Sequence, residues 1–287
     1  MTTPPIQWYP GHIAKAEKAL KEQLKLVDVV LEVRDARIPL ATHHPQVREW
    51  VGSKPRVLVL NRMDMILPQA RQLWTKWFKQ QGEEPYFTNA QDGKGVAAVA
   101  KAMQAAGVEI NNRRRDRGML PRPVRAVVVG FPNVGKSALI NRLLNRRVVE
   151  SAARPGVTRQ LRWVRISDQL DLLDAPGIIP GKLGDQSAAL KLAICDDIGD
   201  ASYDNQRVAA TLIDLLKNLD AKAAKLLPEK PLKSRYEMDP TTITGEDYLH
   251  ALAEQRHKGD VERTARQILT DFRKGLLGAI ALEVPPM

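Results

Sequence analysis

A glycine-rich segment near the middle of the chain has the residue types and spacing that bind phosphate. The segment Gly130-Phe131-Pro132-Asn133-Val134-Gly135-Lys136-Ser137 satisfies the pattern G-x-x-x-x-G-K-[ST]. Its glycines let backbone amides close around phosphate oxygens, and the helix that follows adds a favourable dipole. Lys136 is expected to reach the β- and γ-phosphates of a nucleotide, and Ser137 to ligate Mg²⁺ through its hydroxyl. The nucleotide contacts predicted here are Asn133, Val134, Gly135, Lys136, Ser137 and Ala138.

A second segment has the residues of a Mg²⁺ and γ-phosphate loop. Asp174-Ala175-Pro176-Gly177 follows the apolar run LDLL, so Asp174 stands at the end of a predicted strand. An aspartate there can hold Mg²⁺ through water, and the Gly177 amide can meet the γ-phosphate during catalysis. Thr158, in Pro155-Gly156-Val157-Thr158 between the two phosphate loops, is the expected second hydroxyl ligand of Mg²⁺. The alternative for Thr158 is a solvent-facing loop residue.

Asn61-Arg62-Met63-Asp64 follows the apolar run RVLVL and resembles the N-K-x-D loop that reads guanine. The Asp64 carboxylate would accept hydrogen bonds from guanine N1 and the 2-amino group, a pair that adenine does not offer. Asn61 is expected to hold the loop and to touch the base. Arg62 replaces the usual lysine, and its planar guanidinium can stack on the base. An ATPase would leave Asp64 without a role.

Asn89-Ala90-Gln91, followed by Gly93 and Gly95, resembles the S-A-K loop, which presents a backbone amide to guanine O6. Asn89 stands where that loop has serine, and Gln91 where it has lysine. We therefore predict that all three residues line the guanine site.

The apolar patterns around these loops predict an α/β fold. Val- and Leu-rich runs of strand length precede each loop and alternate with helical patterns, which is typical of a doubly wound, mostly parallel sheet. Strands are expected in residues 27–37, 56–64, 85–90, 125–130, 161–166 and 170–177. Helices are expected in residues 13–27, 46–51, 71–81, 96–106 and 137–145. The Arg-rich segment 111–125 reads as an exposed connector.

After residue 180 the strand patterns stop and the apolar periodicity becomes helical. Helices are expected within residues 188–198, 207–219, 245–257 and 260–278. We therefore predict two domains: residues 1–185 hold the nucleotide loops, and residues 186–287 form a small all-α domain.

The chain of 287 residues carries a formal net charge of +11, and the excess is concentrated. Residues 111–165 contain 14 basic and 2 acidic side chains. Such a field attracts polyphosphates and nucleic acid. No signal peptide or apolar run of membrane-spanning length is found, and the single cysteine, Cys195, reads as a buried residue in a reducing compartment. We expect a cytoplasmic protein without a membrane partner.

The order of the loops is permuted. In an ordinary Ras-like chain the guanine loops follow the phosphate loops, but here Asn61–Asp64 and Asn89–Gln91 precede Gly130–Ser137. Together with the opening run Trp8-Tyr9-Pro10-Gly11-His12-Ile13-Ala14-Lys15-Ala16 and the closing run Asp271-Phe272-Arg273-Lys274-Gly275, this order resembles the ribosome biogenesis GTPase A (YlqF-type) family of circularly permuted GTPases. Leu277-Gly278 and Leu282-Glu283 extend the closing match.

The resemblance implies a circularly permuted P-loop GTPase domain followed by a helical RNA- and ribosome-binding domain. It also implies a cytoplasmic factor for late assembly of the large ribosomal subunit, with GTP, GDP and rRNA as partners. We expect the chain to be monomeric when it is not on the ribosome.

The sequence has no obvious residue to orient the water that attacks the γ-phosphate. Ile178 stands where Ras-like enzymes place the glutamine that orients the water. Slow intrinsic hydrolysis, stimulated by a partner, is therefore predicted. The family's N-terminal motif makes His12 the candidate catalytic group; alternatively, His12 packs or caps a helix. Asn133 resembles the asparagine that ligates an activating K⁺ in related GTPases; alternatively, it only shapes the loop.

The basic stretch 141–165 surrounds Thr158, and RNA held there would sense the nucleotide state. Arg154, Arg159, Arg162 and Arg165 are the residues that would carry this contact. Two other functions stay open. One is a nucleotide-gated RNA-binding scaffold with negligible turnover, and the other is a GTPase that acts on another RNA, such as tRNA.

Overall fold

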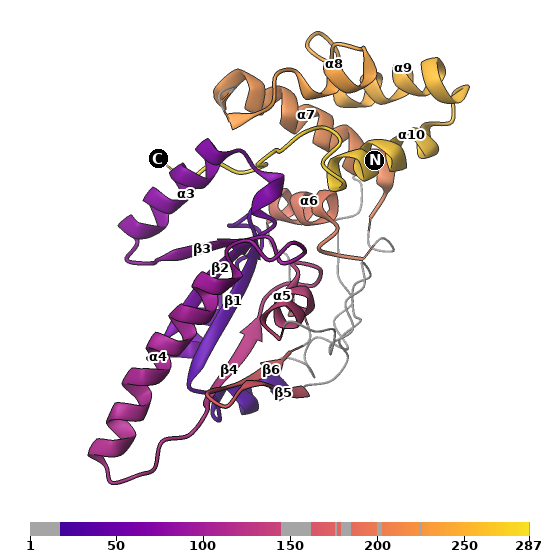
Figure 1. The fold of residues 1–287 in the computed structure, drawn as a ribbon. Helices are drawn as coiled ribbons and strands as arrows, with labels where there is room; N and C mark the ends of the chain where they lie inside the picture. The colour runs from indigo at the N-terminus through magenta and orange to yellow at the C-terminus, as the bar shows by residue number, and fades with distance from the viewer. Residues whose placement is uncertain are drawn as a thin grey trace. The chain divides into compact units, whose positions relative to one another are not determined.

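The P-loop strand β4 lies in the middle of a sheet whose order is β3-β2-β1-β4-β6-β5 in the computed structural model (Figure 1). The structure describes residues 18–144, 162–175, 177–178, 185–199, 203–223 and 226–286. Neighbouring strands are parallel except β5, which runs antiparallel to β6. The strands are β1 (Val29–Asp35), β2 (Arg56–Asn61), β3 (Pro85–Thr88), β4 (Val124–Val129), β5 (Arg162–Ser167) and β6 (Leu170–Asp174).

The strand order explains how a permuted chain can rebuild one nucleotide site. The strands that precede the P-loop in the sequence, β1 to β3, lie on one side of β4, and β6 and β5 lie on the other. Because β1, β2, β3, β4 and β6 are parallel, the loops that follow them emerge at the same edge of the sheet. The predicted doubly wound, mostly parallel sheet is confirmed.

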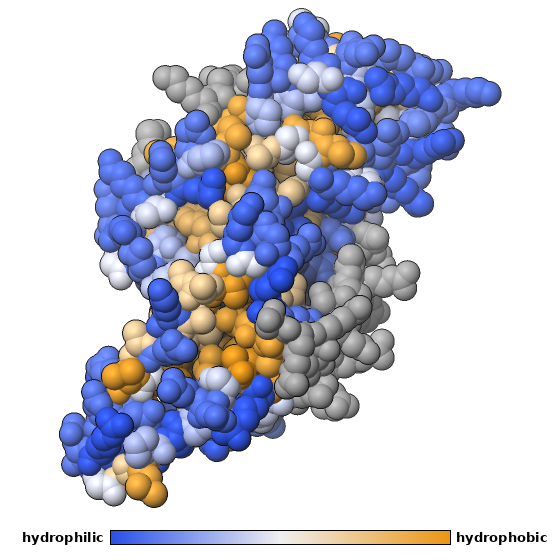
Figure 2. Space-filling model, in the orientation of Figure 1, coloured by the Kyte–Doolittle hydropathy of each residue, from blue (hydrophilic) through white to orange (hydrophobic). Residues whose placement is uncertain are grey.

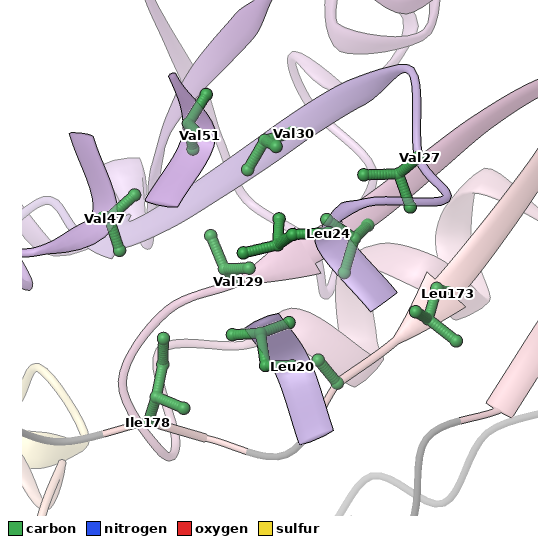
Figure 3. Close-up of a cluster of buried hydrophobic side chains, with 11 residues drawn as sticks. Leu20, Leu24, Val27, Val30, Val47, Val51, Val129, Leu173 and Ile178 are labelled. Atoms are coloured by element: carbon green, nitrogen blue, oxygen red, sulfur yellow. The ribbon is translucent and has the colours of Figure 1, made fainter. Parts of the chain in front are cut away.

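Helices cover both faces of this sheet. On one face lie α4 and α5, while the other face carries α2 and the helical residues 18–24. Figure 3 shows the core on this second face, where Leu20 and Leu24 pack with Val30, Val129 and Leu173 of the strands. The helices before the C-terminal segment are α2 (Val47–Val51), η1 (Met63–Met65), α3 (Pro68–Gln80), α4 (Val96–Asp116) and α5 (Lys136–Leu143).

Helix α4 is longer than predicted. The expected connector begins at residue 111, but the helix continues through its arginines to Asp116. Arginine is a good helix former, and basic side chains are favourable in a last turn. Two residues beyond the end of the helix, Gly118 has a φ of 69° that reverses the chain, and its amide donates to Arg115 O at 2.8 Å.

Charged side chains lie inside β1, which the apolar pattern alone did not predict. Glu32 is 1% exposed and accepts a hydrogen bond of 2.7 Å from Arg34 Nε; it also pairs with Arg56. Burial raises the pKa of Glu32. The charges of Arg34 and Arg56, together with a hydrogen bond from His43, outweigh burial and hold that pKa well below its usual range. The buried charge is thus tolerated because it is paired.

The C-terminal segment is all-helical in its described residues, as predicted. Its helices are α6 (Gln186–Cys195), α7 (Asn205–Ala223), α8 (Pro231–Tyr236), α9 (Gly245–His257) and α10 (Val261–Arg273). The sequence analysis missed α8, a short helix that begins with proline at its first position. No helix in the described part of the chain is long and apolar enough to cross a membrane.

The closing motif stabilises this helical segment. Arg273 donates to the Ala193 and Ile194 carbonyls at 2.8 and 3.0 Å, which satisfies the end of α6. Asp271 accepts hydrogen bonds from Tyr236 Oη at 3.0 Å and Arg235 Nε at 2.8 Å. Burial, together with Asp271, raises the pKa of Tyr236 far above its usual range, so this phenol stays protonated as a donor.

The chain folds as two compact units that do not follow a single cut in the sequence. Among the described residues, one unit takes 18–63, 77–144 and 162–178, and the other takes 64–76 together with 185–286. The functional division into residues 1–185 and 186–287 stays a prediction.

Candidate functional site

The P-loop connects the end of β4 to the start of α5, as the sequence predicts. Lys136 is the first residue of α5 and is almost fully buried. Its Nζ donates to the carbonyls of Gly130 at 3.1 Å and Phe131 at 2.7 Å, which fixes the side chain inside the loop. Gly135 has a φ of 98°, and a Cβ there would lie 2.1 Å from Asn61 Nδ2. The loop therefore needs glycine at this position and can hold an anion at the helix start.

Asn61 joins three loops that are far apart in the sequence. Its Nδ2 donates to Val134 O of the P-loop at 2.8 Å. Its Oδ1 accepts from Thr88 Oγ1 at 3.1 Å and from the Ala90 amide at 3.0 Å. The prediction that Asn61 holds its loop therefore has a structural basis, because the side chain is buried with donor and acceptor both engaged.

Arg62 also contacts the P-loop. Its Nη2 donates to Asn133 O at 2.7 Å, and its backbone has a φ of 63°. Two residues that the sequence analysis missed position this arginine. Asp35 is fully buried, lies 3.4 Å from Arg62 Nε, and accepts hydrogen bonds from Arg37 Nε at 3.0 Å and Nη2 at 2.7 Å. Burial raises the pKa of Asp35, but the charges of Arg37 and Arg62 outweigh burial, so the pKa of Asp35 lies below its usual value.

The remaining residues predicted to read guanine are Asp64 and the turn Asn89–Gln91. Asp64 belongs to η1, three residues after Asn61, and its side chain is exposed. Asn89 Oδ1 accepts from the Gln91 amide at 2.9 Å, which shapes the turn that the sequence compares with S-A-K. Arg142 of α5 donates to the Gln91 carbonyl and fixes that turn against the helix after the P-loop.

The predicted Mg²⁺ residues are placed by the sheet. Asp174 ends β6 and is fully buried, and it pairs with Val128 of β4, two residues before Gly130. Ser137 is the second residue of α5 and is half-buried. A carboxylate and a hydroxyl are hard oxygen ligands, so the donor set fits Mg²⁺ with water and phosphate completing its shell. Val134 is buried, and Ala138 is half-buried in the first turn of α5.

The loop after Asp174 is docked onto the P-loop. A Cβ on Gly177 would lie 2.6 Å from Pro132 N and 2.7 Å from Pro132 Cα, so no larger residue fits there without moving backbone. The Ile178 amide donates to Gly130 O at 3.2 Å. These contacts place the Gly177 backbone directly beside the phosphate loop.

Ile178 is a core residue in this structure. It is 1% exposed and packs in the cluster with Leu20 and Val129, as Figure 3 shows. The position at which Ras-like enzymes place the water-orienting glutamine is therefore apolar, as the sequence shows, and also buried.

Replacing Ile178 by glutamine is expected to destabilise the fold without accelerating hydrolysis. The variant would bury an amide in an apolar cluster, at a cost of about 2–4 kcal/mol. Urea unfolding gives the free energy of unfolding, and single-turnover assays give the hydrolysis rate. Ile178→Val is the control, with an expected cost of about 1 kcal/mol. Faster intrinsic hydrolysis by Ile178→Gln would contradict this account.

Several predicted residues lie outside the described part of the chain. They are His12, Thr158, Arg154 and Arg159. The side chain of Arg162 is likewise outside it. Arg165 is exposed, with its Nε 3.9 Å from Asp171 Oδ1.

Nearly the whole chain is similar in sequence to known GTPases associated with ribosomes. Residues 125–234 match the family model described as 50S ribosome-binding GTPase. The chain is 36% identical to the ribosome biogenesis GTPase A of Bacillus cereus, over 98% of this chain and 94% of the relative. It is 35% identical to the protein of that name from Priestia megaterium, over 98% and 97%. It is 29% identical to the mitochondrial ribosome-associated GTPase 1 of Bos taurus, over 96% and 88%.

A solved structure described as GNP-bound YlqF from T. maritima shares the fold. Its TM-score is 0.65 at 23% identity, with 94% of this chain and 98% of that chain covered. The permuted GTPase fold with a helical C-terminal segment is therefore confirmed.

Proposed function

The chain belongs to the ribosome biogenesis GTPase A family, and on that basis we propose that it is an assembly factor of the large ribosomal subunit whose GTP hydrolysis that subunit stimulates. The chain is a GTPase. The observation that carries the proposal is the Asn61 side chain, which bonds the guanine-loop strand directly to the P-loop and to the Ala90 loop. Those contacts rebuild, from a permuted chain, the loop arrangement that binds GTP.

Each loop has a role in binding. Lys136 would neutralise the β- and γ-phosphates, and the Gly177 amide would contact the γ-phosphate as charge develops on it. Asp64 would read guanine, with Asn89, Ala90 and Gln91 on the other edge of the base. Ser137, Thr158 and Asp174 would hold Mg²⁺, which supplies positive charge between the phosphates when bound.

The water-orienting group must come from elsewhere, because Ile178 is apolar and buried. We propose that contact with the large subunit brings His12 to the water, where its imidazole acts as general base. His12→Ala should then lower the subunit-stimulated rate about 100-fold, while intrinsic hydrolysis and GTP affinity stay unchanged. Single-turnover assays with large subunits measure this effect. An unchanged stimulated rate would assign His12 to packing or helix capping.

Asn133 is the candidate ligand of K⁺. It has a φ of 54°, and its carbonyl binds Arg62, so the loop geometry around it is fixed. A K⁺ held there would place positive charge beside the transferred phosphoryl group, where other GTPases use an arginine finger. We expect faster GTP turnover in KCl than in NaCl of equal ionic strength, and an Asn133→Ala variant should lose the difference. Equal rates of the unchanged protein in the two salts would refute the K⁺ site.

Contact with rRNA is proposed for two regions. The helical segment 186–287 is one, and the basic stretch 141–165 is the other, where neutralising Arg154, Arg159, Arg162 or Arg165 should weaken RNA binding and flatten its salt dependence. The Gly177 loop leads along the chain into the helical segment, so order imposed by the γ-phosphate could reposition the helices. We further propose that the protein is cytoplasmic and monomeric off the ribosome.

Co-sedimentation tests the ribosomal assignment. Purified large and small subunits are mixed with the chain and with GDP or a slowly hydrolysed GTP analogue. We expect retention on large subunits with the analogue, and little with GDP. Equal retention on both subunits, or on neither, would contradict the assignment.

A nucleotide-gated RNA-binding scaffold is the second candidate function, and the buried Ile178 favours it. It predicts nucleotide-dependent binding to the large subunit with no stimulated turnover.

A further inference from the structure

An open cavity lies at the end of the sheet opposite the P-loop. The P-loop follows the last residue of β4, whereas this cavity is lined by Val124, the first residue of that strand, and by Leu170, the first residue of β6. Its volume is about 340 Å³, and α4 forms its other wall with Val108, Asn111 and Arg115. None of the predicted nucleotide-site residues lines it.

Two arginines line the cavity, Arg115 of α4 and Arg122 of the loop that follows this helix. Residues 111–125 contain six arginines and one aspartate. Arg122 forms a bidentate pair with Asp28 at 2.7 and 2.8 Å, which ties the loop to the sheet. Arg115 and Arg117 are exposed at the end of α4, and the exposed Arg113 pairs with Glu109. The lower left of Figure 2 is largely hydrophilic, with a small apolar tip. Met119 and Leu120 are exposed in the loop after α4.

The rim of the cavity is held in place by hydrogen bonds. Asn111 donates to Arg122 O and accepts from Arg122 N, both at 3.1 Å. Arg114 Nε donates to Leu120 O at 3.1 Å, and the Met119 amide donates to Arg114 O at 2.9 Å. A ligand therefore meets a formed rim and loses little free energy in ordering it.

An exposed tryptophan stands on the other face of the sheet, nearer its P-loop end, where Trp163 pairs with Leu173 of β6. Trp163 of the edge strand β5 is 40% exposed, and the Arg125 guanidinium lies 5.9 Å from its ring centroid. Because Arg125 follows Val124, its side chain points away from the cavity. Arginine next to an exposed aromatic ring is a combination that binds unpaired bases by stacking.

We propose that this sheet end binds single-stranded RNA, with one unpaired base in the cavity and an adjacent phosphate on Arg115. Val108 and Val124 offer apolar contact to the faces of the base, and the guanidinium of Arg115 offers donors to its edge. An acidic protein segment would be served by the arginines alone and would not need the cavity. This proposal rests on the proposed function, because an assembly factor of the large subunit would meet ribosomal RNA as the ligand of this site.

Two pairs of single variants on α4 test the site in the full chain. Arg115→Ala removes a phosphate or base contact, and Lys101→Ala removes the same charge from an exposed position that does not line the cavity. Val108→Glu places a carboxylate in the cavity, and Ala105→Glu places one on the same helix outside it. All four positions are on the surface, and circular dichroism verifies that each variant is folded.

The probe is a 12-nucleotide single-stranded RNA with a 5′ fluorescein, titrated by fluorescence anisotropy at several KCl concentrations. Arg115→Ala and Val108→Glu should each raise Kd about tenfold, and Arg115→Ala should lower the salt slope by about 0.7. The two controls should stay within about twofold of the unchanged protein, and a 12-base-pair duplex should bind more weakly than the single strand.

The proposal fails if the unchanged protein does not bind the single strand, or if Arg115→Ala and Val108→Glu bind it as the controls do. Stimulation of the unchanged protein by large subunits is measured separately. If stimulation is present and the cavity variants bind RNA normally, only the cavity site is refuted.

Discussion

Asn61→Ala is expected to weaken GTP binding and to destabilise the nucleotide-binding half of the chain. The substitution leaves the buried Val134 carbonyl and the Ala90 amide without their partner and removes the bond with Thr88. Each unsatisfied buried group costs about 1–3 kcal/mol, so the free energy of unfolding should fall by about 3–5 kcal/mol. Urea unfolding measures that fall, and a fluorescent GDP analogue measures affinity.

Two further variants sharpen this result. Asn61→Asp retains the acceptor for Ala90 and Thr88 but loses the donor to Val134 O. Its free energy of unfolding should lie between those of the unchanged protein and Asn61→Ala, and its nucleotide affinity should fall strongly. Asn218→Ala, at an exposed position of α7, is the matched control and should leave both quantities unchanged. Normal nucleotide affinity in Asn61→Ala would show that the three loops do not depend on this side chain.

Asp64→Asn is expected to change which base the protein binds. The carboxylate accepts two hydrogen bonds from guanine in the proposed site, and an amide would instead present a donor to the 2-amino group. Losing these charge-assisted bonds costs about 3–4 kcal/mol, which is roughly a 100- to 1,000-fold loss of GTP affinity. Xanthosine triphosphate has a carbonyl in place of the 2-amino group, so its affinity should rise.

Competition titrations with GTP, xanthosine triphosphate and ATP against a fluorescent nucleotide measure this exchange. Asp116→Asn, at an exposed position at the end of α4, is the control for the loss of one charge. A variant that binds all three nucleotides as the unchanged protein does would remove Asp64 from the base site and reopen the ATPase alternative.

The phosphate side of the site was largely predictable because its signals are local. The pattern Gly130–Ser137 requires a strand before it and a helix after it, and β4 and α5 are both present. The alternation of strand and helix patterns also predicted the doubly wound, mostly parallel sheet, but not the order of its strands. Those features depend on short-range spacing and on the tendency of alternating strands and helices to form a parallel sheet.

Contacts between distant segments could not be predicted in the same way. Asn61 was expected to hold its loop, but its bond to Val134 depends on strand order and register. Asp35 and Arg37 were missed, because charged residues at the end of a strand usually belong to an exposed turn, whereas here they are buried as a pair. A signal was available in the placement of Asp35 at the end of an apolar strand.

Helix ends were predicted less well than helix interiors. The arginines after residue 110 read as a connector because they lack apolar periodicity, yet they extend α4, and Arg115 among them lines the cavity. The sequence shows that Ile178 replaces a glutamine. The burial of Ile178 against Leu20, however, depends on the helical residues 18–24, which cover one face of the sheet. These differences concern packing, which periodicity alone does not report.

The most direct test of the central claim is GTP turnover in K⁺ buffer, measured for the protein alone, with purified large subunits, and with purified small subunits. We predict slow turnover alone, strong stimulation by large subunits, and no stimulation by small subunits. Equal rates under all three conditions would contradict the claim that the large subunit completes the catalytic site.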